Sequence, residues 1–188
     1  AKNAVKNYSA ILKLCLFATG LSGIVAEYVL STLATYFLGD SVFQWTMIVS
    51  IMLFSMGLGS RFSKNFEGNL LRKFITLEFI LSILVSFVSV LVYTASAYTN
   101  FTSVTIYGLS VIVGLLIGME IPLVIRINES YEVLKVNVSS ALENDYYGSL
   151  LGGVFFAFIG LPFLGLTYTP FVLGAVNFAV AIVLFFSL

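Results

Sequence analysis

The stretch that decides the fold is residues 19–38, TGLSGIVAEYVLSTLATYFL, in which apolar sequence continues on both sides of one carboxylate, Glu27. At ~1.5 Å of helix per residue, Glu27 lies ~20 Å from both Lys13 and Asp40. A bilayer has a hydrocarbon core ~30 Å thick, so a helix that crosses it holds Glu27 near the midplane. An ionisable group at that depth costs at least ~2.5 kcal/mol and usually marks a function or a buried partner. Small and polar residues recur on the same helical face at Gly20, Gly23, Glu27, Ser31 and Thr35.

The composition indicates an integral membrane protein. Of the 188 residues, 60% are hydrophobic and 10% are charged, and the mean hydropathy is +1.06. The net charge of zero argues against a nucleic-acid binder that works through a basic surface. The sequence has no histidine, which excludes His-based nucleophile pairs and His-ligated metals, and its lone cysteine, Cys15, lies in an apolar run. We therefore expect no catalytic residue, metal site or cofactor in this chain.

Six segments are long and apolar enough to predict an all-α bundle of six transmembrane helices, forming one domain over residues 1–188. The predicted spans are residues 9–38, 42–60, 74–98, 104–125, 140–161 and 170–188. The connections 39–41, 99–103 and 162–169 contain no Lys or Arg. The other side receives all nine basic residues, Lys2, Lys6, Lys13, Arg61, Lys64, Arg72, Lys73, Arg126 and Lys135. The positive-inside rule then predicts a multi-pass protein of the cell membrane with both termini in the cytoplasm.

Four carboxyl groups lie inside the predicted spans: Glu27, Glu78, Glu120 and Asp145. The last three fall in the cytoplasmic half, so converging faces would form a funnel of negative charge that leads to Glu27. No basic residue lies deep enough to neutralise Glu27, so it either holds a proton or meets a cation. Pro122 follows Glu120 and leaves one carbonyl of its helix, that of Gly118, without its helical partner.

Structural roles are the alternative for these acids. Glu78 and Glu120 would then extend to the interface and pair with Arg72, Lys73 or Arg126. Asp145 would be a charge at a helix N-terminus, favoured by the helix dipole. Glu27 would be a protonated acid that is hydrogen-bonded to a neighbouring span.

Two pairs of glycines predict close contact between helices. Gly114 and Gly118 form one GxxxG motif, and Gly148 and Gly152 form another. Such spacing lets two helix backbones approach closely, so we interpret both motifs as packing surfaces inside the bundle.

Four stretches together resemble a known domain: residues 20–41, residues 54–61 (FSMGLGSR), residues 118–123 (GMEIPL) and residues 144–153 (NDYYGSLLGG). They are similar to the N-terminal membrane domain that is fused to some spermidine synthases, the polyamine aminopropyltransferases. The resemblance implies that Glu27, Tyr28, Glu78, Glu120 and Asp145 stand where that domain carries its membrane acids. The soluble catalytic half of that family is absent from these residues, so we predict that this chain is not itself an enzyme.

The leading prediction for function is an acidic intramembrane site that binds or transports polyamines or other cations. Its residues are Glu27, Tyr28, Glu78, Glu120, Asp145 and Tyr146, where the two tyrosines offer aromatic faces to a cation. One alternative is a membrane anchor or scaffold for a cytoplasmic enzyme domain. Another is a proton- or sodium-coupled carrier of small molecules. The expected partners are the lipid bilayer, a cationic ligand, and a cytoplasmic soluble domain or a second copy of the chain, with no nucleic acid.

Overall fold

The computed structural model describes residues 2–187, with side chains from Tyr8 onward, and within these residues it is helical without any strand. The helices are α1 (Lys2–Leu38), α2 (Ser41–Ser63), α3 (Leu70–Tyr98), α4 (Thr102–Asn128), α5 (Leu134–Phe155), the π-helix η1 (Phe156–Leu164) and α6 (Gly165–Phe186). The predicted all-α class is confirmed. The side chains of Lys2 and Lys6 and the predicted end of the last span, Leu188, lie outside the described part of the chain.

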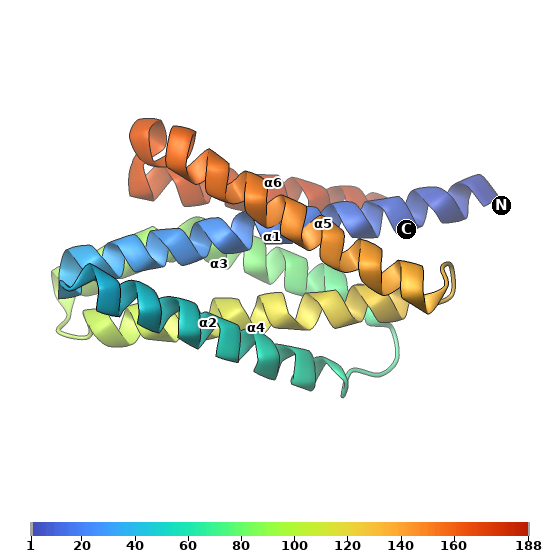
Figure 1. The fold of residues 1–188 in the computed structure, drawn as a ribbon, viewed down its shortest axis with the longest axis horizontal. Helices are drawn as coiled ribbons and strands as arrows, with labels where there is room; N and C mark the ends of the chain where they lie inside the picture. The colour runs from blue at the N-terminus through green and yellow to red at the C-terminus, as the bar shows by residue number, and fades with distance from the viewer. Residues whose placement is uncertain (1, 188) are drawn as a thin grey trace.

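Five helical segments are long and apolar enough to cross a membrane, so the prediction of six spans is confirmed only in part. Four of them match predicted spans, and the fifth is the continuous stretch Leu134–Phe186, which contains α5, η1 and α6. The predicted connection 162–169 is helical, because Pro162 lies inside η1 and α6 follows directly from Gly165. The chain reverses at Gly165, whose φ of 70° is a left-handed conformation that suits glycine. Figure 1 shows α5 running to this point and α6 running back.

The helix of the predicted fifth span begins six residues before residue 140, because α5 begins at Leu134. Asn137 explains the earlier start. Its amide nitrogen donates to the carbonyl of Ile125 at 2.8 Å, and its amide oxygen accepts from Asn128 at 3.2 Å. These bonds fix the first turns of α5 against the end of α4.

Glycines bring two pairs of helices into close contact. A Cβ added at Gly148 would clash with the carbonyl of Phe17 on α1, and one at Gly118 would clash with the backbone of Met56 on α2. The interpretation of both GxxxG motifs as packing surfaces within the bundle is confirmed. The first motif joins α4 to α2, and the second joins α5 to α1.

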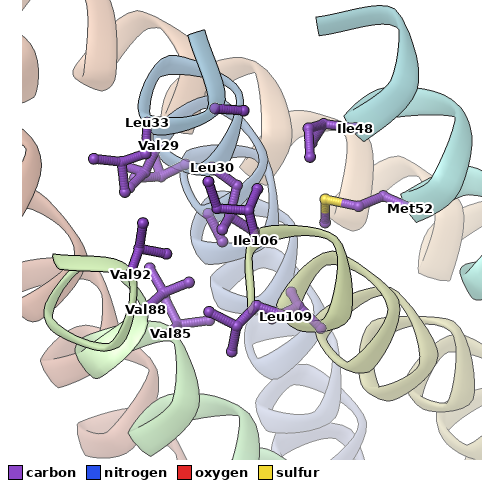
Figure 2. Close-up of a cluster of buried hydrophobic side chains, with 14 of the residues drawn as sticks. Val29, Leu30, Leu33, Ile48, Met52, Val85, Val88, Val92, Ile106 and Leu109 are labelled. Carbon is purple, nitrogen blue, oxygen red and sulfur yellow. The ribbon is translucent and has the colours of Figure 1, made fainter. Parts of the chain in front are cut away.

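The core consists of two apolar clusters that follow one another along the bundle. Figure 2 shows the larger cluster, where Leu30 of α1, Met52 of α2, Val88 of α3 and Ile106 of α4 converge. The smaller cluster includes Leu12, Leu16, Phe74, Leu123 and Leu184. On α1, α3, α4 and α6, buried polar residues fall where the two clusters meet, and we call them the polar layer: Thr19, Ser22, Glu78, Ser82, Glu120 and Asn177.

Both described ends of the chain lie toward the same end of the bundle in Figure 1. The connections 64–69 and 129–133 are at that end, while the turn at residues 39–40, the turn at residues 99–101 and the reversal at Gly165 are at the opposite end. Basic side chains therefore gather at the end of the bundle that holds the termini.

Candidate functional site

A cavity of about 170 Å³ lies on the face of α1 that carries Glu27. Four helices line it: α1, α2, α4 and α5. Three of the predicted site residues are among the lining residues, namely Glu27, Asp145 and Tyr146, and so is Thr19 of the polar layer. We call this space the acidic cavity.

The close contact of α1 with α5 positions Asp145 beside the acidic cavity. A Cβ at Gly20 would clash with the carbonyl of Asp145, so only glycine allows this approach. The hydroxyl of Ser149 strengthens the crossing, because it lies 2.9 Å from the carbonyl of Asp145 and 3.3 Å from that of Gly20. Thr19, Gly23 and Glu27 follow at four-residue spacing and hence share the face of α1 that opens onto the cavity.

The carboxyl groups at the acidic cavity have no basic partner among the described residues. The ion pair among the described residues joins Lys13 to Glu132, and neither of these lines the cavity. Asp145 is only 6% exposed, and its Oδ1 has no hydrogen-bond partner. Buried carboxyl oxygens of this kind are normally satisfied, because an unpaired one loses its hydration without compensation.

Glu78 and Glu120 lie behind Thr19, and both are fully buried. The Thr19 hydroxyl oxygen is 2.8 Å from Oε1 of Glu78 and 2.6 Å from Oε2 of Glu120. A hydroxyl has one hydrogen, so Thr19 can donate to one of these oxygens and must accept from the other group. The two contacts therefore require a proton on one of the two carboxyl groups.

The alternative pairing of Glu78 and Glu120 with interfacial cations is wrong. Arg126 donates instead to the carbonyls of Ser63 and Phe66, at 2.9 and 2.8 Å. Lys73 donates to the carbonyl of Glu67 at 2.6 Å. These basic side chains thus bind backbone at the end of α2 and in the α2–α3 connection.

The alternative role of Asp145 as a charge at a helix N-terminus is also wrong. Since α5 begins at Leu134, Asp145 lies about three turns inside the helix. The dipole effect is limited to the first turn and does not account for an acid at this depth.

The four acids do not form the one continuous funnel that was predicted for them. Glu27 and Asp145 line the acidic cavity, whereas Glu78 and Glu120 are separated from it by Thr19. Tyr146 is 64% exposed and lies at the mouth. Tyr28 is not at the cavity, because its ring packs against Trp45 and Phe156 with both centroid distances at 5.5 Å.

Thr19 and Ser149 are site residues that the sequence analysis did not select. Thr19 precedes Gly23 and Glu27 at four-residue spacing, so this periodicity was a usable signal. Ser149 lies four residues after Asp145 on α5. Nothing in the sequence indicates that its hydroxyl approaches α1.

No protein-family model matches the chain, and no solved structure matches it. Three proteins with similar sequences are named polyamine aminopropyltransferase. The one from Aquifex aeolicus, polyamine aminopropyltransferase 2, is 49% identical over 94% of this chain and 36% of its own length. Those from Oceanobacillus iheyensis and Leptospira interrogans are 35% and 36% identical, over 93% and 85% of this chain and 33% and 32% of their own lengths. The chain thus spans about a third of the length of these relatives.

These relatives contradict the prediction that the chain is not an enzyme. The relatives that match nearly all of its length are named as enzymes, so the sequence gives no ground for excluding this chain from an enzyme family. The four sequence stretches resemble the polyamine aminopropyltransferases, which is also the name of these relatives. Over almost its whole length, this chain is similar to about a third of each of several polyamine aminopropyltransferases.

Proposed function

We propose that this chain is the membrane-embedded part of a polyamine aminopropyltransferase and that the acidic cavity binds an ammonium group of a polyamine. The name of the relatives supports the polyamine link. Five long apolar segments support the membrane location. The segment Leu134–Phe186 reverses at Gly165 and would cross twice, which gives six crossings. The basic residues lie at the end of the bundle that holds the termini, and by the positive-inside rule they favour a cytoplasmic location for that end.

One observation carries the proposed site: two carboxyl groups line a cavity and have no basic partner within the described residues. An ammonium group has three donors, which suit the unpaired Oδ1 of Asp145 or the carboxylate of Glu27, and a polyamine carries more than one ammonium group. The cavity has room for five or six water molecules at ~30 Å³ each, enough for the aminoalkyl end of a polyamine. The rest of the ligand would leave past Tyr146, whose aromatic face can contact a second ammonium group.

The same observation favours ligand binding over anchoring alone. An anchor needs apolar helices that pack together, and it has no need of a cavity with acidic walls. In this proposal, a cytoplasmic catalytic part of the enzyme exchanges polyamine with the cavity.

A proton-coupled carrier is the second candidate, and the contact of Thr19 with two buried carboxyl groups favours it. Thr19 lines the acidic cavity, so a cation at Glu27 and a proton behind Thr19 would influence each other. Uptake of radiolabelled spermidine into proteoliposomes, measured with and without a pH gradient, tests this candidate. Uptake that does not respond to the gradient contradicts it.

Calorimetric titration of the detergent-solubilised protein tests the proposed site. Spermidine and putrescine should bind saturably, whereas 1,4-butanediol, a neutral analogue of putrescine, should not. Glu27→Gln and Asp145→Asn should each weaken binding at least about tenfold, since each removes one charge from a poorly solvated site. Glu143→Gln is the matched control, because Glu143 is an exposed acid on α5 that does not line the cavity.

Two results would contradict the proposal. One is the absence of saturable amine binding to the native protein. The other is an equal loss of affinity in Glu143→Gln and Glu27→Gln, which would indicate general attraction to surface charge.

A further inference from the structure

A polar ridge at the start of α3 separates two apolar grooves on the outer surface of the bundle. Arg72 and Thr76 form the ridge, because both are exposed and lie one helical turn apart. The groove on one side, about 700 Å³ in volume, has Ile75 and Phe79 of α3 and Phe185 of α6 as walls. The groove on the other side, about 320 Å³, lies beside Phe66 and Leu77. Arg72 and Thr76 line both grooves, and we call the whole surface the split groove.

We propose that the split groove binds an anionic diacyl phospholipid. The phosphate would lie on Arg72, and one acyl chain would occupy each groove. A single-chain molecule would leave one groove empty, whereas a diacyl lipid has two apolar chains that diverge from one charged group. The shared ridge between two apolar channels matches that shape.

Charge supports an anionic headgroup at this place. The guanidinium of Arg72 is exposed and takes no part in the ion pair between Lys13 and Glu132. The neighbouring Lys73 is held by the carbonyl of Glu67 and lies 5.1 Å from the ring centroid of Phe66, so it adds positive charge beside the ridge. A guanidinium group offers two parallel donors to a phosphate, which a single ammonium group cannot do.

The direction of the grooves also fits a lipid. Arg72 is in the first turns of α3, at the end of the bundle that collects the basic residues. Phe79 lies seven residues farther along α3, which is ~10 Å toward the middle of the bundle. A lipid placed in this way has its phosphate at the interface and its chains in the hydrocarbon core.

Native mass spectrometry of the protein, released from detergent micelles, tests the proposal. Phosphatidylglycerol should remain bound, and phosphatidylcholine of the same chain length should bind at least about fivefold more weakly. Arg72→Gln should weaken phosphatidylglycerol binding about fivefold, because it removes one cation near the headgroup. Arg61→Gln is the matched control, since Arg61 is an exposed basic residue at the end of α2 that lines neither groove.

A second variant examines the grooves separately from the charge. Thr76→Trp places a large ring on the ridge at an exposed position and should block both channels without disturbing the core. Retained helicity by circular dichroism and retained spermidine affinity show that the variant is folded. The acidic cavity shares no lining residue with the split groove, so the two measurements are independent.

Three results would overturn the proposal. They are equal binding of the two lipids, equal effects of Arg72→Gln and Arg61→Gln, and full displacement of the lipid by inorganic phosphate. The last result would mean that the ridge recognises a free phosphate and that the grooves contribute nothing.

Discussion

Thr19 has the most constrained position in the polar layer, because its one hydroxyl touches two buried carboxyl groups. The remaining oxygens of those groups, Oε2 of Glu78 and Oε1 of Glu120, have no partner among the described residues. Asp145 has an unpartnered oxygen as well. Because buried carboxyl oxygens are normally hydrogen-bonded, these three unpaired oxygens are available to bind protons or cations.

Replacing Glu120 should remove the shared proton. In Glu120→Gln, the amide can donate to Thr19 while Thr19 donates to Glu78, so the contact no longer requires a protonated acid. The infrared C=O stretching band of carboxylic acids should therefore weaken in the variant relative to the native protein. Glu143→Gln serves as the control and should leave the band unchanged. An unchanged band in Glu120→Gln and also in Glu78→Gln would contradict the shared proton.

The ion pair between Lys13 and Glu132 should make stability depend on pH. The two groups are 2.6 Å apart, and the hydrogen bond from Lys13 holds the pKa of Glu132 below its ordinary value. A group whose pKa is lowered by folding stabilises the protein above its ordinary pKa, and this stabilisation is lost as the pH falls through the lowered value. Its size should be at most about 1 kcal/mol, because both side chains are partly exposed.

Thermal unfolding of Glu132→Gln, followed from neutral to acidic pH, measures this contribution. The variant should melt below the native protein at neutral pH, and the difference should disappear in acid. Glu129→Gln alters an exposed acid in the same connection and should melt like the native protein at each pH. A difference that grows in acid would have the wrong sign for this ion pair.

Two α-helices, α4 and α6, contain a proline, and in each case a serine from a neighbouring helix compensates for it. Pro122 in α4 cannot donate to the carbonyl of Gly118, which accepts instead from the Ser60 hydroxyl at 2.8 Å. Pro170 in α6 likewise cannot donate to the carbonyl of Leu166, which accepts instead from the Ser89 hydroxyl of α3. The carbonyl predicted to lack its helical partner in the sequence analysis is therefore satisfied from another helix.

A double-mutant cycle should reveal that Ser60 and Pro122 depend on each other. Ser60→Ala should lower the free energy of unfolding by about 1–3 kcal/mol, because the Gly118 carbonyl loses its partner. In a Pro122→Ala background, the amide of residue 122 can donate to that carbonyl, so Ser60→Ala should have little effect. Unfolding in a denaturing detergent measures both values. Equal effects of Ser60→Ala in the two backgrounds would contradict the compensation.

Sequence patterns predicted these helices well where the cause was local. Long apolar runs predicted α2 and α3, although α3 begins at Leu70, four residues before the predicted span. The sequence analysis did not select Asp40 and Asn69 as caps, but each side chain accepts from the backbone amide three residues later. The first turns of α5 were missed because Asn137 is held there by α4, and such a contact has no local signature. The helical conformation of residues 162–164 was missed because a proline in an α-helix usually ends it, whereas the wider turns of η1 contain it.

At the scale of the whole molecule, the sequence could predict which acids lie inside the bundle but could not predict which of them lie together. Acids stand out in apolar sequence, so all four were selected as candidates. Their grouping depends on helix packing: the approach of α5 at Gly20 brings Asp145 to the cavity, and Thr19 separates the other two acids from it. Tyr28 was selected because the resemblance includes it and its ring could contact a cation, but it packs against Trp45 and Phe156 instead, since adjacent residues on a helix face different directions.

Cysteine labelling can establish how often the chain crosses the membrane. Cys15 is the one native cysteine and is buried, so it should not react with an impermeant maleimide. New cysteines at the exposed residues Asn100 and Tyr168 should react from outside intact cells. Cysteines at Glu67 and Glu129 should react only after the membrane is opened. If the cysteine at Tyr168 behaves like that at Glu67, the segment Leu134–Phe186 does not cross twice.

The two ends of the bundle differ in how much backbone they present to a macromolecule. At the end away from the termini, α1 and α2 are joined by residues 39–40, α3 and α4 by residues 99–101, and α5 passes through η1 into α6. An antibody or a protease needs an extended segment to bind, and this end offers almost none. Epitope tags and protease sites for biochemical work therefore belong in the connections 64–69 and 129–133, where an insertion would lengthen an existing loop.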